Sequence, residues 1–226
     1  MKANNMNKVY IIGVGFRPLD KNARKVLLDS EVVLSNGRLL EAFKNYDEYE
    51  EVKDKIITLQ NIHETKKYIR DNYQQKTIAL LAAGDPMFFG IGRVIKDEIG
   101  KDAIEVFPDL SSVQVAFSKI KEPSSNAFFI SFHGGPDPEN RRKLEYEIDE
   151  LPKLITEHSM LAILTDRVNT PEKIAESIIS AYPSCIIYVC EKLGYEDEKI
   201  TEGSPDEIAL MSFTHPNVVI IKSNEV

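Results

Sequence analysis

The sequence predicts an α/β fold made of two α/β domains, on the basis of three observations. Short runs rich in β-branched residues alternate with longer stretches of helical spacing along the chain. This alternation is typical of sheets in which helices join many parallel strands. Near the middle of the 226 residues, the polar segment KIKEPSSNA at 119–127 interrupts the pattern. We therefore expect an N-terminal domain over residues 1–120 and a C-terminal domain over residues 121–226.

The N-terminal half contains a series of expected strands and helices. The strands are the apolar runs KVYIIGV, EVVLS, KIITL, TIALLAA and IEVFP, at residues 8–14, 31–35, 55–59, 77–83 and 104–108. Helical spacing covers residues 20–29, 62–73, 87–99 and 111–119. Because helical segments separate the strands, we expect a largely parallel sheet.

The C-terminal half resumes with four more apolar runs. They are AFFISF, MLAILT, CIIYVC and NVVIIK, at residues 127–132, 160–165, 185–190 and 217–222. The charge-rich segment ENRRKLEYEIDE at 139–150 predicts a helix with a solvated face. Cys185 and Cys190 would lie on opposite faces of one strand, so we expect two core thiols rather than a disulfide or a shared metal site.

The charge balance limits the classes of partner. Lys and Arg number 28 against 36 Asp and Glu, which gives a net charge of −8 and argues against a broad nucleic-acid surface. The apolar stretch near the start is too short to span a membrane and lacks a signal-peptide cleavage pattern. A cytoplasmic protein with no membrane partner is the default expectation. An anionic substrate would need a local basic pocket.

The first glycine motif is Gly13-Val14-Gly15, directly after the first expected strand. A dinucleotide-binding fingerprint needs a third glycine where Pro18 stands, and an acid after the second strand, which this chain lacks. The phosphate-binding pattern GxxxxGK[ST] is also absent. The glycines alone fit a tight strand-to-helix turn as well as they fit a ligand site.

The corner Gly84-Asp85-Pro86 follows the fourth expected strand. Ligands of open α/β sheets bind beyond the carboxyl ends of strands, and the small residues Ala82, Ala83 and Gly84 let a ligand approach the backbone. Pro86 restricts the backbone of Asp85. A fixed carboxylate suits ribose hydroxyls or an amino group better than phosphate. The alternative is that Asp85 caps the following helix.

A third corner, Pro108-Asp109-Leu110-Ser111-Ser112, lies between the fifth strand and the next helix. The two hydroxyl groups can cap that helix, and with its free N–H groups they can also hold a polar ligand. Capping is the simpler interpretation of this corner alone. Three such corners after three strands of one domain favour a shared ligand site.

Taken together, these motifs resemble those of the tetrapyrrole methylases in order and spacing. The segments EVVLSNGRLLEAF, SFHGG, LAILTDRVNTPEKIA and CEKLGYEDEKITEG are similar to those of the branch that methylates C5 of precorrins. The resemblance covers nearly the whole chain. It departs where Phe16-Arg17-Pro18 stands in place of a usual Pro-Gly pair, and at Gly135, where an arginine is common.

The resemblance implies the fold of that family, with two α/β domains around a cofactor cleft, and S-adenosyl-L-methionine as the cofactor. The implied cofactor-binding residues are Ala83, Gly84, Asp85, Ser111, Ser112, Thr165 and Gly203. The implied substrate-binding residues are Gly13, Gly15, Arg17, Arg38 and Arg93, of which the arginines would pair with carboxylates. No metal ligand and no catalytic side chain is expected, and His133 is interpreted as a structural histidine.

The activity that the resemblance implies is methyl transfer to C5 of cobalt-precorrin-7 on the route to cobalamin. Relatives with a fused C15-methylating, decarboxylating module exist, so a separate protein is expected to supply that activity here. The resemblance also implies a homodimer, and we expect the apolar strands of the second domain to offer more surface than a chain of this size readily covers. Two alternatives stay open: a methylase of the same fold with a protein or RNA acceptor, and a non-catalytic sensor that binds S-adenosylmethionine.

Overall fold

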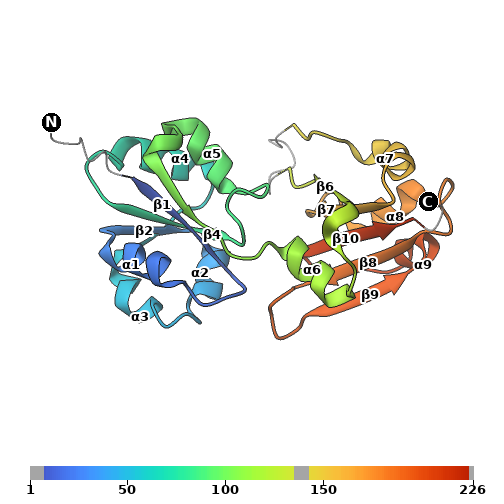
Figure 1. Ribbon diagram of the computed structural model, residues 1–226, viewed down its shortest axis with the longest axis horizontal. Helices are drawn as coiled ribbons and strands as arrows, with labels where there is room; N and C mark the ends of the chain where they lie inside the picture. Colours follow the sequence, from blue (N-terminus) through green and yellow to red (C-terminus); the bar gives the residue numbers. More distant parts are fainter. Residues whose placement is uncertain (1–7, 135–142, 224–226) are drawn as a thin grey trace. The chain divides into compact units, whose positions relative to one another are not determined.

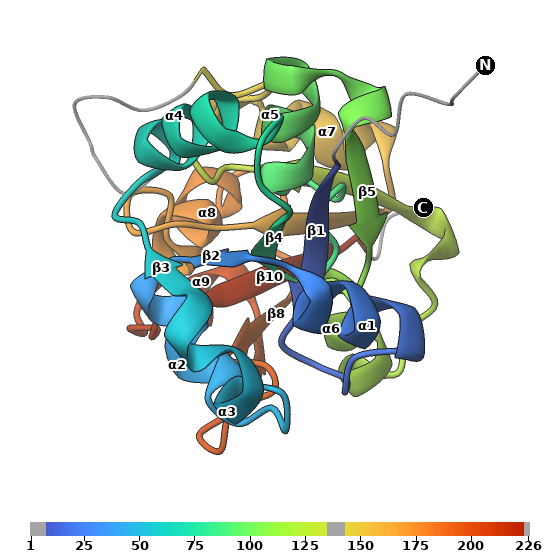
Figure 2. The same ribbon diagram turned by 90° about the vertical axis from the view of Figure 1, so that its left-hand side faces the viewer.

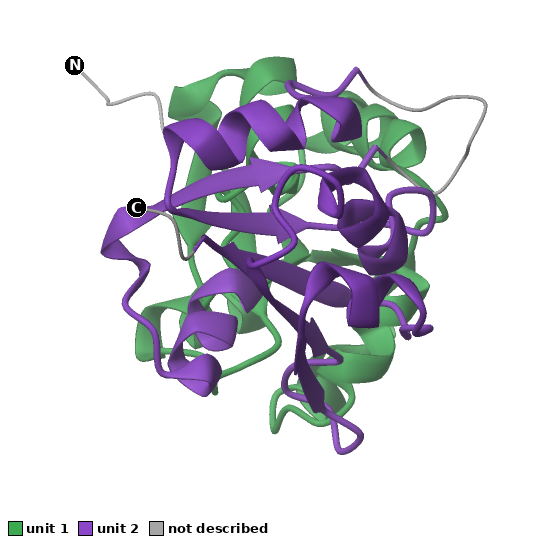
Figure 3. Ribbon diagram, turned by 90° about the vertical axis from the view of Figure 1, so that its right-hand side faces the viewer, with its two compact units in different colours: residues 1–111 green, residues 112–226 purple. Residues whose placement is uncertain are grey.

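A computed structural model describes residues 8–134 and 143–223. The chain divides into two compact units, Met1–Ser111 and Ser112–Val226 (Figure 3). The expected boundary after residue 120 had assigned the helix α6 (Ser112–Ile120) to the N-terminal domain. In the structure this helix contacts the strands β7 (Met160–Leu164) and β10 (Asn217–Lys222) of the C-terminal unit, which is why the division falls before it.

The N-terminal unit contains a five-stranded parallel sheet with the order β3-β2-β4-β1-β5 (Figure 1). Its strands are Val9–Val14 (β1), Val32–Ser35 (β2), Ile56–Thr58 (β3), Ile78–Ala83 (β4) and Ile104–Phe107 (β5). The sequence predictions for all five strands are confirmed. All carboxyl ends therefore emerge at one edge of this sheet, with β4, β1 and β5 side by side.

Helices cover both faces of this sheet (Figure 2). One face packs with Ala23 and Leu27 of α1, Leu39 and Phe43 of α2, and Val52 of α3. The opposite face packs with Ile69 of α4 and Ile95 of α5. The bounds are Lys21–Asp29 (α1), Gly37–Phe43 (α2), Tyr49–Val52 (α3), Ile62–Asn72 (α4) and Ile91–Ile99 (α5), with short 3-10 turns at Lys53–Lys55 and Lys101–Ala103.

The C-terminal unit contains a mixed sheet with the order β6-β7-β10-β8-β9. Only the pair β6 and β7 is parallel among its described strand pairs. The strands are Ala127–Ser131 (β6), Met160–Leu164 (β7), Ile186–Glu191 (β8), Lys199–Gly203 (β9) and Asn217–Lys222 (β10). The sequence analysis missed β9, because its residues are mostly polar and only partly buried.

The helices α7 (Leu151–Glu157), α8 (Pro171–Ile178) and α9 (Pro205–Ala209) cover one face of the second sheet. On the other face, α6 contributes Phe117, whose ring contacts that of Phe129. Short 3-10 turns lie at Ser124–Asn126 and Ile148–Glu150. The central strands β7, β8 and β10 are almost fully buried within the single chain.

Two helix predictions need correction. The helix expected over 87–99 begins only at Ile91, because a turn held by the Asp85 carboxylate occupies the residues before it. The expected helix over 139–150 is wrong for its described part, since residues 143–147 are not helical and only Ile148–Glu150 form a 3-10 turn. Every second residue of this segment packs on the core, namely Leu144, Tyr146 and Ile148. A spacing of two residues is typical of an extended chain. Residues 139–142 and Gly135 lie outside the described part.

Both cysteines are free and buried, as predicted. Burial raises the pKa of the Cys190 thiol to about 12. Such a thiol is inert as a nucleophile near neutral pH, in keeping with a packing role.

Candidate functional site

The three corners noted in the sequence follow the adjacent strands β1, β4 and β5 of the N-terminal sheet. Hydrogen bonds join them directly. The N–H of Gly84 donates to the carbonyl of Val14 at 2.9 Å, and the N–H of Asp109 donates to the carbonyl of Gly84 at 3.3 Å. Segments that are far apart in the chain therefore form one continuous surface at the carboxyl edge of the sheet, where ligands of open α/β sheets bind.

Two glycines permit this close approach. A Cβ atom on Gly13 would lie 2.1 Å from the carbonyl oxygen of Gly84 and 2.5 Å from the amide nitrogen of Asp109. Gly84 has φ of +61° and lies against the backbone of Leu110, so a side chain there would meet both strain and a clash. Gly13 is thus a buried packing residue at the centre of the edge, and its contact with substrate stays a prediction.

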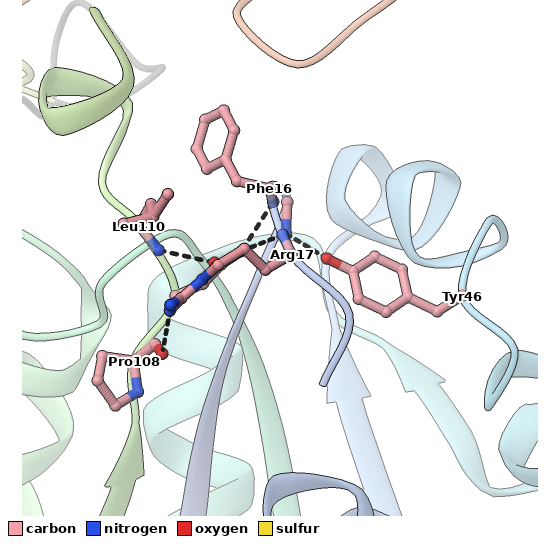
Figure 4. A network of polar contacts seen from close by, with 7 residues as sticks. Phe16, Arg17, Tyr46, Pro108 and Leu110 are labelled. Atoms are coloured by element: carbon pink, nitrogen blue, oxygen red, sulfur yellow. Dashed lines mark hydrogen bonds and ion pairs between the residues drawn. The ribbon is translucent and has the colours of Figure 1, made fainter. Parts of the chain in front are cut away.

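The buried carboxylate of Asp109 connects the third corner to the loop after β1 (Figure 4). Its Oδ2 accepts hydrogen bonds from the backbone N–H groups of Phe16 at 2.7 Å and Arg17 at 3.2 Å. Its Oδ1 accepts from Nε of Arg17 at 2.8 Å and from the backbone N–H of Leu110 at 2.7 Å. Four donors and one opposite charge thus offset the cost of burying this carboxylate.

Tyr46, which follows α2, holds the same loop from another direction (Figure 4). Its hydroxyl oxygen accepts a hydrogen bond from the N–H of Gly15 at 2.7 Å. Burial raises the pKa of the Tyr46 hydroxyl, and the Gly15 hydrogen bond opposes that rise. The phenol therefore stays neutral at neutral pH. Neither Tyr46 nor Asp109 was among the predicted site residues.

Asp85 stands at the exposed side of the second corner. Its Oδ1 accepts a hydrogen bond from the N–H of Met87 at 2.8 Å, so it stabilises the local turn. The predicted alternative that it caps the following helix is wrong, because the N-cap of α5 is Gly90. Within the described residues, Oδ2 of Asp85 has no hydrogen-bond partner. The preceding residues are the exposed Ala83 and the positive-φ Gly84.

Ser111 and Ser112 follow the third corner. Ser111 is buried and ends the N-terminal unit, whereas Ser112 is partly exposed and begins α6. The helix therefore starts at the predicted place. The first backbone N–H groups of a helix have no acceptor within the helix.

The predicted substrate residues have different surroundings. Nε of Arg17 binds Asp109 and one of its Nη atoms donates to the carbonyl of Pro108 at 3.2 Å, so this side chain is already engaged. Arg38 and Arg93 are exposed and form no ion pair or hydrogen bond through their side chains within the described residues. They stand in the first turns of α2 and α5, which follow the adjacent strands β2 and β4. Gly15 is exposed with open space around it.

The predicted residues of the C-terminal unit are less open. The Thr165 hydroxyl is buried and donates to the carbonyl of Asn217 at 2.8 Å. Gly203 ends β9 beside a surface hollow that Cys185 and Glu207 also line. His133 is exposed in the loop after β6, and its backbone N–H donates to the Ser131 hydroxyl at 3.3 Å.

No group of His, Cys, Asp and Glu side chains in the described part of the chain is arranged to hold a metal ion. Across the same residues, the helices are all too short or too polar to cross a lipid bilayer.

The comparisons with known proteins all point to the same family. The family model for tetrapyrrole (corrin/porphyrin) methylases matches residues 8–209. A probable cobalt-precorrin-7 C(5)-methyltransferase of Methanocaldococcus jannaschii is 33% identical over 226 aligned positions, which cover 96% of this chain and 99% of that protein. The crystal structure of the precorrin-6Y methylase of Archaeoglobus fulgidus superposes with a TM-score of 0.69 at 25% identity, and covers 97% of this chain and 100% of that one.

A third relative is longer than this chain. The decarboxylating precorrin-6Y C(5,15)-methyltransferase of a Sinorhizobium species is 27% identical over 147 residues, which cover 64% of this chain but 33% of that protein. The match is therefore confined to one part of the larger enzyme.

Proposed function

Because this chain belongs to the tetrapyrrole (corrin/porphyrin) methylases, a family of S-adenosylmethionine-dependent methyltransferases, we propose that it methylates C5 of cobalt-precorrin-7 in cobalamin biosynthesis. A relative named for that activity aligns over nearly the whole of both chains. A corrinoid acceptor follows from the same similarity.

The observation that carries the proposal is the Ala83-Gly84-Asp85 corner on the central strands of a parallel sheet. Gly84 has no side chain at a position where a Cβ would meet the backbone of the third corner. Beside it, Asp85 has a carboxylate oxygen without a partner in the described residues. An uncharged backbone cradle and one acid suit a cofactor that has hydroxyl and amino groups and no phosphate.

In this proposal Ala83, Gly84 and Asp85 bind the cofactor together with Ser111 and Ser112. Asp85 accepts hydrogen bonds from ribose hydroxyls or the amino group, while the start of α6 supplies N–H donors. Thr165 and Gly203 are proposed as ligands from the C-terminal unit. Their support is weaker, because the Thr165 hydroxyl already donates to Asn217.

S-adenosylmethionine supplies an electrophilic methyl group on a sulfonium centre. The chain's own task is to hold the acceptor carbon in line with that methyl group and to exclude water. Holding two bound ligands in the reactive orientation accelerates the transfer. No nucleophilic side chain is needed for this transfer. The pKa of the Cys190 thiol, which burial raises to about 12, agrees with that assignment.

The acceptor carries many carboxylates, and Arg38 and Arg93 are the proposed partners for them. They flank the carboxyl edge from opposite faces of the sheet, since α2 packs on one face and α5 on the other. Arg17 is less suited to the role, because Asp109 already neutralises its charge.

The direct test is to incubate the purified protein with cobalt-precorrin-7 and S-adenosylmethionine whose methyl group is labelled with ¹³C. We expect mass spectrometry to show one added methyl group and carbon NMR to place it at C5. Methylation at another ring position, or none, would contradict the proposal. A sensor would bind the cofactor in calorimetry without turnover, and an RNA or protein methylase would label that acceptor instead.

A homodimer and a separate C15-methylating enzyme are further parts of the proposal. The Sinorhizobium relative supports the second, because most of that protein lies outside the match. Family resemblance alone supports the dimer, since the chain itself already covers the central strands of the second sheet. Sedimentation equilibrium at micromolar concentration tests it, and a monomer there would contradict it.

A further inference from the structure

Phe16 presents an apolar ring at the carboxyl edge of the N-terminal sheet. The ring points away from the strands (Figure 4). The residue is partly exposed and belongs to neither of the core clusters described for this unit. It has no ring contact among the described residues. A partly exposed aromatic side chain that lies outside these core clusters has ring surface to offer to a ligand at this edge.

The backbone that carries this ring is fixed by side chains. Three consecutive N–H groups, those of Gly15, Phe16 and Arg17, each donate to a side-chain oxygen of Tyr46 or Asp109. The acceptors come from parts of the sequence far from the loop. The position of the backbone that carries the Phe16 ring is therefore set by the tertiary structure and not by the loop alone.

The same contacts remove charge from the loop. Arg17 and Asp109 form an ion pair whose carboxylate is buried and whose guanidinium is about half exposed. The backbone of Phe16 is thus bonded to a neutralised pair, while Arg38 and Arg93 form no ion pair within the described residues and remain free to bind anions. The loop after β1 is suited to the flat conjugated part of an acceptor and not to its carboxylates.

We infer that Phe16 forms the surface against which the conjugated ring system of the corrinoid stacks, and that Asp109 and Arg17 are positioning residues for it. The inference rests on the proposed function, because it takes the acceptor to be a tetrapyrrole-derived ring. Offset stacking of flat π systems supplies affinity and fixes orientation at once. Methyl transfer to one particular ring carbon requires that orientation.

The test is steady-state kinetics with cobalt-precorrin-7, alongside calorimetry with S-adenosylmethionine and thermal unfolding. For Phe16→Leu we expect the Michaelis constant for the corrinoid to rise about tenfold, as loss of an aromatic contact predicts. The dissociation constant of the cofactor and the melting temperature should stay near those of the parent. Phe16→Tyr keeps the aromatic face and should restore the Michaelis constant.

A double variant separates positioning from direct binding. We expect Arg17→Gln alone to raise the Michaelis constant about threefold, and to add nothing in the Phe16→Leu background, because Arg17 acts through Phe16. Arg70→Gln is the matched control. Arg70 is 57% exposed against 53% for Arg17 and also forms an ion pair, but it lies near the end of α4, which leads into the amino end of β4.

Each outcome decides the question. An unchanged Michaelis constant for Phe16→Leu overturns the inference while the proposed function stands. Effects of Phe16→Leu and Arg17→Gln that multiply would show that Arg17 contacts the substrate itself, which overturns its positioning role. If the parent protein leaves cobalt-precorrin-7 unmethylated, the proposed function fails and this inference fails with it.

Discussion

Nε of Arg17 lies 2.8 Å from Oδ1 of Asp109, and the two residues are 92 positions apart in the chain. The pair is asymmetric, because the Asp109 side chain is 3% exposed and the Arg17 side chain 53%. Removal of the buried partner should therefore cost more than removal of the exposed one. Asp109→Ala leaves three backbone N–H groups without their acceptor, whereas Arg17→Ala leaves the carboxylate with three donors.

We expect Asp109→Ala to lower the free energy of unfolding by about 2–4 kcal/mol, since each lost hydrogen bond to a charged group costs about 1.5–3 kcal/mol and part of the loop can relax. Arg17→Ala should cost about 1 kcal/mol or less, as half-exposed ion pairs do. Urea denaturation of both variants measures the difference. Equal losses would show that the loop is not held by the buried carboxylate.

Tyr46 gives a prediction with a defined pH dependence. Burial raises the pKa of its hydroxyl above the ordinary value of 10.0, so the folded protein holds this proton more tightly than the unfolded chain. The stabilisation is fully present below the unfolded pKa and is lost as the pH rises through the folded pKa. Tyr46→Phe should cost about 0.5–1.5 kcal/mol at pH 8 for the lost hydrogen bond to Gly15.

Above pH 10 the difference between the parent and Tyr46→Phe should shrink, because only the parent loses stability through this group. Thermal unfolding of both proteins between pH 8 and pH 11 tests the expectation. Tyr188, whose pKa is also raised by burial, titrates in both proteins and therefore cancels in the comparison. A constant difference across the range would place Tyr46 in a solvated environment.

The sequence predicted the parallel sheet and its three corners because both signals are local. A β-branched run identifies a strand, and small or turn-forming residues at its end mark a corner. Parallel pairing then brings Val14, Gly84 and Asp109 to one edge, so the three predicted corners meet there. The helix over 87–99 was predicted too long, because the bond from Met87 to Asp85 is a side-chain effect that periodicity does not contain.

The partners of the loop after β1 could not be predicted in the same way. Arg17 looked like a substrate ligand, because a lone arginine in a loop gives no sign of a carboxylate 92 residues later. Tyr46 belongs to no motif of the sequence analysis, and its bond to Gly15 joins residues 31 positions apart. The sequence shows that Phe16-Arg17-Pro18 departs from the usual Pro-Gly pair, but the bonds of Phe16 and Arg17 to Asp109 appear only in the structure.

Gly13 tests whether close packing of the corners holds the site together. A methyl group there would lie 2.1 Å from the Gly84 carbonyl oxygen, which backbone on both sides keeps in place. We expect Gly13→Ala to lower the free energy of unfolding by about 2–4 kcal/mol, in the range of severe steric substitutions. Gly37→Ala is the matched control, because a Cβ on Gly37 meets nothing within 4 Å. Similar unfolding curves for the two variants would contradict the packing of the corners.

Asp85 tests the cofactor site. Asp85→Asn keeps an oxygen for the Met87 N–H but removes the charge, while Asp85→Ala removes both. Loss of a charge-assisted hydrogen bond should weaken S-adenosylmethionine binding in both variants by about 1.5–3 kcal/mol, with only a small change in stability for Asp85→Asn. Calorimetry at one pH measures the affinity. If both variants bind as tightly as the parent, the Asp85 carboxylate serves the turn and not the cofactor.

The carboxylates of the acceptor give the last prediction, which concerns salt. Arg38 and Arg93 are exposed, so ion pairs that they form with a ligand are screened over a length of about 8 Å at physiological ionic strength. The Michaelis constant for cobalt-precorrin-7 should therefore rise steeply with added salt, while the affinity for S-adenosylmethionine changes little. The cofactor is the internal control within each measurement.

Arg38→Gln and Arg93→Gln should each raise that Michaelis constant about fivefold at low salt, because a partly exposed ion pair contributes up to about 1 kcal/mol. The turnover number should stay near that of the parent if each arginine binds the ground state and the transition state equally. Each variant should also depend less on salt than the parent, since one screened pair is gone. Arg70→Gln, whose guanidinium pairs with Glu98, should keep the parent's salt dependence. Parent-like behaviour of both Arg38→Gln and Arg93→Gln would mean that other side chains hold the carboxylates, and the acceptor would then not lie across β2 and β4.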